Sequence, residues 1–289
     1  MTATCSLCGG RARRLRTFAT LGTECTDLWC CQACGTEFLS RQPSDAWLAR
    51  EYAAYYTRRE ATVTRPKRDY FSRILHDSGV NFAGQTVLDV GTGEGDCVAA
   101  INRDWPDARP TFLETNANAA RQHADLEGEW VCQDVETWLR TAEARYDAIL
   151  LFDVLEHLRQ PLSTLKELVA TGLKPGGLVV ATFPSASSLS RALLGRFWPQ
   201  YKVEHLFYFS EAGVAELAAR SGLETLLLRG LRKTLPLDYF LAVGSNFGPA
   251  LTRPLSRAAR RLVPACLRRR PCSLWTGEWH WVARRRTSS

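Results

Sequence analysis

The sequence lacks long apolar segments. None of its stretches approaches the roughly 20 apolar residues that a membrane-spanning helix needs, and its first residues lack the basic and then apolar pattern of a signal peptide. We therefore expect a cytoplasmic protein. With 289 residues, of which 45% are hydrophobic, the chain can bury a full core and is expected to form one main domain with a smaller attachment.

A glycine-rich segment follows a short run of β-forming residues and precedes a helix-like stretch. It reads Val87-Leu88-Asp89-Val90-Gly91-Thr92-Gly93-Glu94-Gly95. Glycine lets the backbone approach a ligand closely, and the start of the following helix offers unpaired N–H groups, so we expect a nucleotide-like ligand here. The dinucleotide-binding fingerprint would need glycine at position 96, where the chain has Asp96, and this disfavours a dehydrogenase.

This segment resembles motif I of the class I S-adenosylmethionine-dependent methyltransferases, in which a hydrophobic strand leads into an acidic residue and G-x-G-x-G. Further segments resemble later motifs of the family and follow in its order: Thr111 to Glu114, Val131 to Val135, Tyr146 to Asp153, Val154 to Leu158 and Leu173 to Gly177. Several motifs in one order are far more specific than a lone glycine loop. The alternative is a doubly wound α/β domain that has lost its ligand.

The resemblance also implies which residues bind S-adenosylmethionine. Glu114 would accept hydrogen bonds from both ribose hydroxyls, because one carboxylate has acceptor sites for two donors. Asp134 and the backbone of Val135 would read the adenine. The other residues that the resemblance places at the cofactor are Asp89, Gly91, Gly93, Gly95, Phe152 and Tyr56, and either Tyr55 or Tyr56 could close over it as a lid.

Cysteine is concentrated at the N-terminus, where six of the ten cysteines lie within the first 34 residues. Two C-x-x-C-G pairs occur there, Cys5 with Cys8 and Cys31 with Cys34. Each pair points two thiolates at one point, so the four predict a tetrahedral zinc site. All four positions of the metal would then be filled by sulfur, and we expect a structural zinc. A disulfide framework is the alternative, which the absence of an export signal disfavours.

This leader resembles the zinc ribbon that precedes many bacterial methyltransferases of sugar, polysaccharide and natural-product pathways. We expect the ribbon over residues 1–40 and a helical connector over 41–82. The connector has a helix-like stretch from Asp45 to Thr57 whose aromatic residues have the spacing of a packing face. Residues 83–289 would then form the methyltransferase domain, with a basic insertion at about 230–274.

Strand-like and helix-like segments alternate through this domain. Strands are expected near 86–90, 109–114, 129–132, 146–152, 178–183, 223–228 and 278–283, with a helix from Glu211 to Ser221. Such alternation predicts an α/β fold, a Rossmann-like doubly wound sheet of seven strands that binds ligands at the carboxyl ends of the strands. Glu114, Asp134 and Asp153 lie at such ends. By the resemblance, the last strand runs antiparallel.

Histidine is scarce, and only two of the five histidines are plausible general bases. His157 follows the fourth strand, and His205 lies in a segment that resembles the family's "EHL-aromatic-FS" stretch over the acceptor side. Asp153 is the third catalytic candidate, because it could take a proton or orient an acceptor hydroxyl. The alternative for His157 is a capping or packing role at a helix start.

Positive charge is concentrated near the C-terminus. The stretch from Arg229 to Arg286 holds 13 basic residues against two acidic ones, a net charge of +11, while the rest of the chain is net acidic. Residues 252–270 have an amphipathic helical pattern that Pro264 should kink or split. Such a segment could be a solvated face, could contact a membrane surface or lipid-linked phosphate, or, less favoured, could bind nucleic acid.

Together these features predict a methyltransferase that uses S-adenosylmethionine to O-methylate a sugar, glycan precursor or secondary metabolite, with peripheral contact to the inner membrane surface as an option. One alternative is an RNA methyltransferase that holds RNA through the zinc ribbon and basic tail. Against it, the fourth strand ends Phe-Asp-Val-Leu-Glu and lacks the Asn/Asp-Pro-Pro-Tyr motif of base-nitrogen methylation. A second alternative is a non-catalytic zinc-ribbon scaffold.

Overall fold

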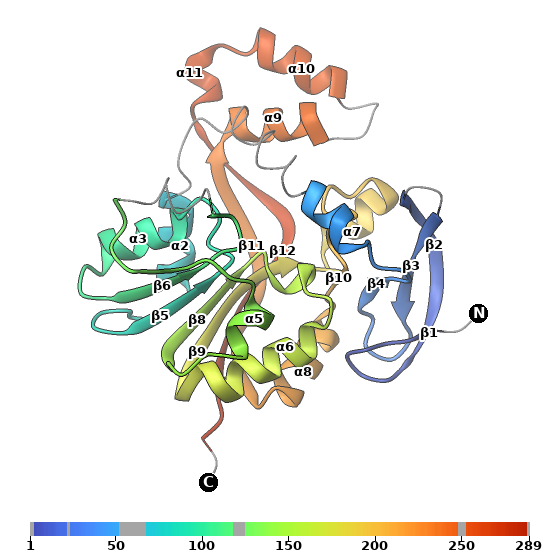
Figure 1. Ribbon diagram of the computed structural model, residues 1–289. Helices are drawn as coiled ribbons and strands as arrows, with labels where there is room; N and C mark the ends of the chain where they lie inside the picture. The colour runs from blue at the N-terminus through green and yellow to red at the C-terminus, as the bar shows by residue number, and fades with distance from the viewer. Residues whose placement is uncertain (1–2, 22–23, 52–67, 118–124, 248–252, 288–289) are drawn as a thin grey trace.

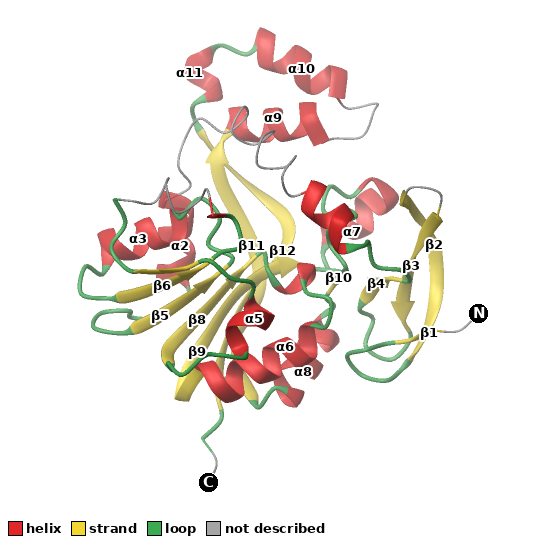
Figure 2. Ribbon diagram, viewed as in Figure 1, coloured by secondary structure: helices red, strands yellow, loops and turns green. Residues whose placement is uncertain are grey.

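A seven-stranded sheet forms the centre of the computed structural model, which describes residues 3–21, 24–51, 68–117, 125–247 and 253–287 (Figures 1 and 2). Its strands, in chain order, are β5 (Thr86–Val90), β6 (Arg109–Leu113), β7 (Glu129–Val131), β8 (Tyr146–Phe152), β9 (Leu173–Pro184), β11 (Leu223–Pro236) and β12 (Pro271–Arg285). Their order across the sheet is β11-β12-β9-β8-β5-β6-β7. All seven contain segments that the sequence predicts as strands.

Strand direction follows the expectation as well. Strands β7, β6, β5, β8 and β9 pair in parallel, whereas β12 runs antiparallel to both β9 and β11. The central strand β8 is almost continuously buried because helices cover both faces of the sheet. The domain therefore has the mixed, Rossmann-like α/β fold that its sequence predicts.

The two faces of β8 pack into different cores, since alternate side chains of a strand point to opposite faces. Ile149 lies in a core cluster with residues of α5 (Val135–Leu139), α6 (Pro161–Glu167) and α8 (Glu211–Arg220). Leu150 lies in the second cluster, with residues of α2 (Arg68–Asp77) and α3 (Asp96–Asp104). These layers fix the strand ends that carry the site.

A second sheet is built from the N-terminal segment. It has the order β1-β2-β3-β4-β10, formed by β1 (Ala3–Thr4), β2 (Arg11–Leu21), β3 (Glu24–Cys31), β4 (Glu37–Leu39) and β10 (Phe207–Tyr208). The last of these strands lies in the main domain just before α8 and pairs antiparallel with β4. The N-terminal sheet is therefore completed by residues that are distant in sequence.

Strands β11 and β12 extend past the sheet as a two-stranded arm, in which pairing continues to Pro236 and Pro271. Its tip carries α9 (Leu237–Phe247), α10 (Arg253–Leu262) and α11 (Ala265–Arg268), which rise above the sheet in Figure 1. We call these three helices the cap. The predicted break at Pro264 is present, because Pro264 precedes the first residue of α11.

Short elements connect the two sheets on the side of the N-terminal segment. They are the 3-10 helix η1 (Leu155–His157), α7 (Leu189–Leu194) and the 3-10 helix η3 (Gly195–Phe197). The π-helical turn η2 (Leu168–Gly172) instead joins α6 to β9 within the main domain. Within the described ranges, no helix is both long enough and apolar enough to cross a membrane.

Candidate functional site

The glycine loop leaves β5 and enters α3 with three left-handed backbone positions. Gly91, Gly93 and Gly95 have φ values of 69°, 56° and 70°. A Cβ at Gly91 would also lie 3.0 Å from a methyl carbon of Val154. Glycine is thus required here by backbone conformation and by space, as the sequence predicts for a loop that approaches a ligand.

Glu114 lies directly after β6 and faces this loop. Its Oε2 accepts a hydrogen bond from the Gly93 N–H at 2.9 Å, and its Oε1 accepts one from the Asn116 N–H at 3.0 Å. The side chain is buried. Oε1 also accepts a hydrogen bond from the Thr115 hydroxyl at 3.1 Å. Oε2 keeps a lone pair that a ligand hydroxyl could use, so the carboxylate suits the predicted contact with a ribose.

Asp89, near the end of β5, is a buried carboxyl group whose Oδ2 accepts a hydrogen bond from the Thr92 hydroxyl at 2.6 Å. Burial raises the pKa of Asp89 to about 7, although the Thr92 hydrogen bond opposes the shift. The group therefore titrates near neutral pH.

Asp134 and Val135 lie at the start of α5. The two carboxylate oxygens of Asp134 accept hydrogen bonds from the Thr137 N–H at 2.7 Å and the Thr137 hydroxyl at 2.8 Å. Asp134 thus caps α5, a role that the sequence interpretation omitted. Val135 is the first helical residue and is buried.

Phe152 and Asp153 end β8 on the same edge of the sheet. Phe152 is buried against Phe71, with ring centroids 5.5 Å apart. Asp153 has a φ of 55°, and it is the only non-glycine residue with a positive φ in the described part of the chain. Its Oδ1 accepts a hydrogen bond from the Thr182 hydroxyl at 3.0 Å. Strained residues of this kind concentrate at functional sites.

His157 and His205 meet beside this strand end, with ring centroids 4.8 Å apart and ring planes at 88°. Burial lowers the pKa of His157 to about 4 and lowers the pKa of His205 well below its usual value. Both imidazoles are therefore neutral at pH 7. They lie close together although 48 residues separate them along the chain, which the sequence alone could not establish.

Glu156 is a further member of this group that the sequence analysis did not single out. It is 1% exposed, and its Oε2 has no hydrogen-bond partner. Burial raises the pKa of Glu156 well above its usual value. The sequence offered one signal for Glu156, its place beside His157. This signal is weak, because a carboxylate next to a histidine gives no hint of burial.

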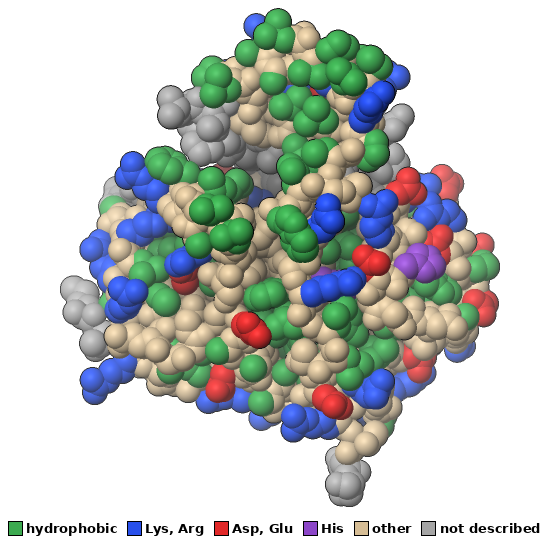
Figure 3. Space-filling model, turned by 180° about the vertical axis from the view of Figure 1, so that it is seen from behind, with side chains coloured by type: hydrophobic (Ala, Val, Ile, Leu, Met, Phe, Trp, Pro, Cys, Tyr) green, Lys and Arg blue, Asp and Glu red, His purple; other side chains and the backbone are tan. Residues whose placement is uncertain are grey.

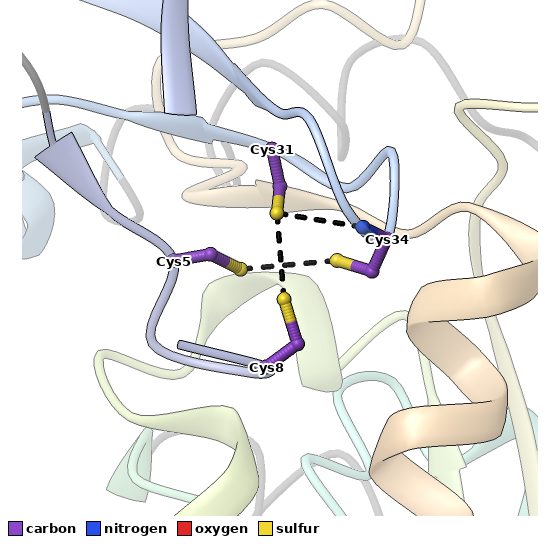
Figure 4. A group of neighbouring side chains, drawn as sticks. All are labelled: Cys5, Cys8, Cys31 and Cys34. Atoms are coloured by element: carbon purple, nitrogen blue, oxygen red, sulfur yellow. Dashed lines mark hydrogen bonds between the residues drawn. The ribbon is translucent and has the colours of Figure 1, made fainter. Parts of the chain in front are cut away.

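The four predicted metal ligands come together in the N-terminal sheet (Figure 4). The sulfurs of Cys5 and Cys34 are 3.8 Å apart and those of Cys8 and Cys31 are 3.4 Å apart. All ten cysteines are free, so the structure contains no disulfide framework. Four sulfurs held at about 2.3 Å around a tetrahedral zinc ion would be separated by about 3.8 Å, so the spacing fits zinc.

Backbone groups support these thiols. The Gly10 N–H donates to the Cys8 sulfur at 3.3 Å, and the Cys34 N–H donates to the Cys31 sulfur at 3.4 Å. Such hydrogen bonds orient and stabilise thiolate ligands. The predicted lid residues Tyr55 and Tyr56 lie outside the described residues, and only residues 45–51 of the predicted connector helix are described as helical.

Comparison with known proteins gives the family. The family described as "Methyltransferase domain" matches residues 56–228, more than half of the chain. Trans-aconitate 2-methyltransferase of Azoarcus sp. strain BH72 is 29% identical over 140 residues, covering 48% of this chain and 51% of that protein. Ubiquinone biosynthesis O-methyltransferase of Cereibacter sphaeroides is 33% identical over 129 residues, covering 40% and 49%. The chain thus spans about half the length of these curated relatives.

Solved structures show the same fold. A chain of the complex between the Haloferax volcanii Trm112 methyltransferase activator and a methyltransferase has a TM-score of 0.56 and 19% identity, covering 86% of this chain and 99% of that chain. The crystallised methyltransferase from Bacillus halodurans has a TM-score of 0.54 and 17% identity, covering 75% and 99%. The matched residues include the glycine loop, Glu114 and the end of β8, and the chain belongs to the methyltransferase-domain family.

Proposed function

We propose that the protein is an S-adenosylmethionine-dependent methyltransferase. The observation that carries the proposal is the glycine loop in a chain of this family, with Glu114 bonded to Gly93 at the carboxyl edge of the sheet. Three glycines with positive φ let the loop approach the cofactor, and Glu114 would hold the ribose. Asp134 and Val135 would flank the adenine, while Asp89, Phe152 and Tyr56 would complete the cofactor site.

The acceptor is proposed to be a hydroxyl of a sugar, glycan precursor or secondary metabolite. One of the relatives is named as an O-methyltransferase, which supports oxygen as the nucleophile. Bound S-adenosylmethionine supplies an electrophilic methyl group. The chain's part is to align the acceptor oxygen with that methyl and to exclude water, and positioning of this kind can contribute about 7–11 kcal/mol.

Asp153, His157 and His205 are proposed to form the acceptor side, because they lie at or beside the end of β8. A neutral imidazole can accept the proton of the acceptor hydroxyl as the oxygen–carbon bond forms. His205→Ala should then lower turnover about 10²–10⁴-fold and leave cofactor affinity unchanged. Full activity of this variant with the true acceptor would exclude His205 as the base.

We further propose that Cys5, Cys8, Cys31 and Cys34 bind a structural zinc ion, since sulfur would occupy all four positions of a tetrahedral metal. Residues 1–40 would form this zinc unit, residues 41–82 a connector and lid, and residues 83–289 the methyltransferase domain. The zinc unit would stabilise the acceptor side through the pairing of β4 with β10, which begins two residues after His205.

The test of the main proposal is a calorimetric titration of zinc-replete protein with S-adenosylmethionine and S-adenosylhomocysteine. Glu114→Ala should weaken binding about 10- to 100-fold, because hydrogen bonds to a charged group contribute about 1.5–3 kcal/mol. The exposed carboxylate of Glu224 offers a matched control, and Glu224→Ala should leave affinity unchanged. Absence of binding in the unmodified protein would favour the scaffold alternative.

We also propose that the cap contacts phosphate groups of an anionic membrane surface or of a lipid-linked acceptor. Arginines of α10 and α11 line a hollow of about 290 Å³, and they are Arg257, Arg260, Arg261 and Arg268. Arg260 and Arg268 are partly neutralised by ion pairs with Asp238. Leu255 and Leu262 are 69% and 81% exposed, and Figure 3 shows apolar side chains across this end of the molecule.

Vesicle sedimentation tests this contact. Vesicles of phosphatidylglycerol should bind the protein, and Arg257→Gln together with Arg261→Gln should weaken binding at least fivefold, given about 1 kcal/mol for each basic residue at the surface. If the protein bound soluble diphosphate but no vesicles, the site would be assigned to a lipid-linked acceptor. A complex with RNA that weakens steeply with salt would instead support the RNA alternative.

A further inference from the structure

A second group of metal-ligating side chains lies on the acceptor side, apart from the cysteines. Glu156 and His157 come from η1 and His205 comes from the loop before β10. One donor atom from each of the three lies within 4.8 Å of the others. The Leu206 N–H donates to the Glu156 carbonyl at 2.7 Å, so the backbone itself holds the two segments together.

The surroundings of this group differ from those of ordinary packed side chains. Glu156 is almost fully buried, yet one carboxylate oxygen has no protein partner. A buried carboxylate oxygen without a partner is energetically costly, and a bound cation would remove that cost. His157 is partly exposed, which leaves the group open on one side.

Both imidazoles are oriented by backbone carbonyl groups. His205 Nδ1 donates to the Gln200 carbonyl at 2.9 Å, and His157 has a hydrogen bond with the backbone of Glu204. When Nδ1 of a neutral imidazole carries the proton, Nε2 presents a lone pair. Metal-binding histidines are typically fixed in this way by a carbonyl or a carboxylate.

We propose that Glu156, His157 and His205 bind a divalent metal ion of the zinc class. Two imidazole nitrogens and one carboxylate oxygen form a three-ligand set, which leaves a position open for water or substrate. The proposed cysteine site has four sulfur ligands and no open position. The protein would therefore hold two zinc ions of different kinds, one structural and one reactive.

The open position gives this ion a role on the acceptor, and that role, unlike the binding itself, rests on the proposed methyl transfer. With both imidazoles bound to the metal, neither could take a proton, so the ion would replace His205 as the group that activates the acceptor. An acceptor hydroxyl bound there would have a lowered pKa and would release its proton to water. The oxygen would then form a bond to the methyl carbon as the carbon–sulfur bond breaks, and the electron pair would remain on sulfur. The electrostatic influence of Lys202 reaches all three side chains and would favour the anionic oxygen.

Metal content tests the binding. Full-length protein is saturated with zinc chloride, freed of excess metal by gel filtration, and analysed for zinc per chain. The unmodified protein should retain two equivalents, and Glu156→Gln and His205→Gln should each retain one. His76→Gln is the matched control, because His76 lies exposed on α2 and should not change the count. One equivalent in the unmodified protein at saturating zinc would overturn the proposal.

Cobalt loading distinguishes the two ions and also reports on folding. The cysteine site gives thiolate-to-cobalt charge-transfer absorption, which should persist in Glu156→Gln while the weaker absorption of the second cobalt disappears. Charge-transfer absorption from both cobalt ions would overturn the proposal, and this result does not require a folded variant. Two zinc ions in protein that fails to bind S-adenosylmethionine would preserve the metal site and exclude the methyl transfer.

Discussion

At the scale of single residues, the buried carboxyl group of Asp89 should make the stability of the protein depend on pH. Burial raises its pKa from 3.8 to about 7, so the folded protein retains a proton that the unfolded chain has already lost. A group whose folded pKa is raised in this way reduces stability as pH rises from the unfolded value through the folded value. Above about pH 7 the penalty stays constant.

Asp89→Asn should remove this dependence, because an amide can still accept the Thr92 hydrogen bond but does not ionise. Between about pH 5 and about pH 8, we expect the unmodified protein to lose about 2–3 kcal/mol relative to the variant, at about 1.4 kcal/mol per pKa unit. Urea denaturation of both proteins without ligand measures the difference. Parallel pH profiles would show that Asp89 is ionised throughout.

Lys233 and Glu278 form a buried ion pair between β11 and β12, with Nζ and Oε1 2.6 Å apart and side chains 13% and 3% exposed. Lys233→Met should destabilise the protein by about 3–5 kcal/mol, because it leaves a buried carboxylate without its cation. The double variant Lys233→Met/Glu278→Leu should recover at least half of the loss. Thermal or urea unfolding of the three proteins measures both effects.

An exposed pair gives the comparison for this prediction. Arg220 and Glu216 are four residues apart on α8, with side chains 46% and 40% exposed. Glu216→Gln should change stability by less than about 1 kcal/mol, since water screens the pair.

For the buried pair, the contrary outcome is that the double variant Lys233→Met/Glu278→Leu is no more stable than Lys233→Met alone. That result would show that the destabilisation comes from lost packing and not from an unpaired carboxylate.

At the scale of elements, the N-terminal sheet contacts the segment that carries His205. The Leu39 N–H donates to the Leu206 carbonyl at 3.1 Å, and Phe38 pairs with Phe207. Glu37 is almost fully buried, and its carboxylate accepts hydrogen bonds from Tyr201 at 2.6 Å and from Arg191. The sheet that contains the four cysteines therefore ends in a strand that begins two residues after His205.

Removal of the proposed structural zinc should loosen this shared edge. We expect amide exchange in residues 205–210 to become at least about tenfold faster after chelation, which corresponds to a loss of about 1.4 kcal/mol in local stability. Exchange in β5 and β6 should not change. Hydrogen exchange read by mass spectrometry measures both regions, and protection of residues 205–210 in metal-free protein would show that the edge is stable without zinc.

The positions of the sheet strands could be predicted because each is a compact apolar run bounded by turns. The length of β11 could not be predicted, because Leu231 is buried in the core but most of the other residues after Leu228 are held by pairing with β12, which the sequence does not reveal. Strand β10 was missed for a similar reason. It has two residues, and its partner lies 169 positions away along the chain.

In the candidate site, the glycine loop could be predicted from the sequence, but the contacts between distant segments could not. The loop glycines carry a local signal, since their positive φ is a property of single residues. The meeting of Glu156 with His205 is a tertiary contact between segments whose separation the sequence does not reveal. The capping role of Asp134 has a local signature, because Thr137 lies three residues further along, but the resemblance to a cofactor motif outweighed it.

At the scale of the whole molecule, the arm joins the cap to the domain, and Tyr239 and Phe240 of α9 also pack against the core cluster that contains Leu150. Pro236 pairs with Pro271, so residues 237–270 can be replaced by a short turn without displacing the paired strands. We expect the shortened protein to fold and to bind S-adenosylmethionine with affinity within about twofold of the unmodified protein, since truncation tolerance depends on the backbone contacts removed. Its binding to anionic vesicles should be lost.

Calorimetry and vesicle sedimentation of the shortened protein give the two readouts. Retained vesicle binding would place the membrane contact elsewhere, for example on α7, where Leu189 and Leu193 are 72% and 75% exposed. Loss of cofactor affinity together with a lower unfolding temperature would show that the cap supports the sheet. A shortened protein that keeps its cofactor but methylates no acceptor would assign acceptor choice to the cap.

The completion of the N-terminal sheet by β10 also has a consequence for biosynthesis. Residues 3–39 leave the ribosome well before residues 207–208 are made, and Phe207 pairs with Phe38 and Tyr208 pairs with Glu37 across 169 and 171 positions of the chain. Contacts of such separation form late in folding. The four cysteines of the proposed zinc site are all translated early, but the sheet around them gains its last strand only after most of the chain has been translated.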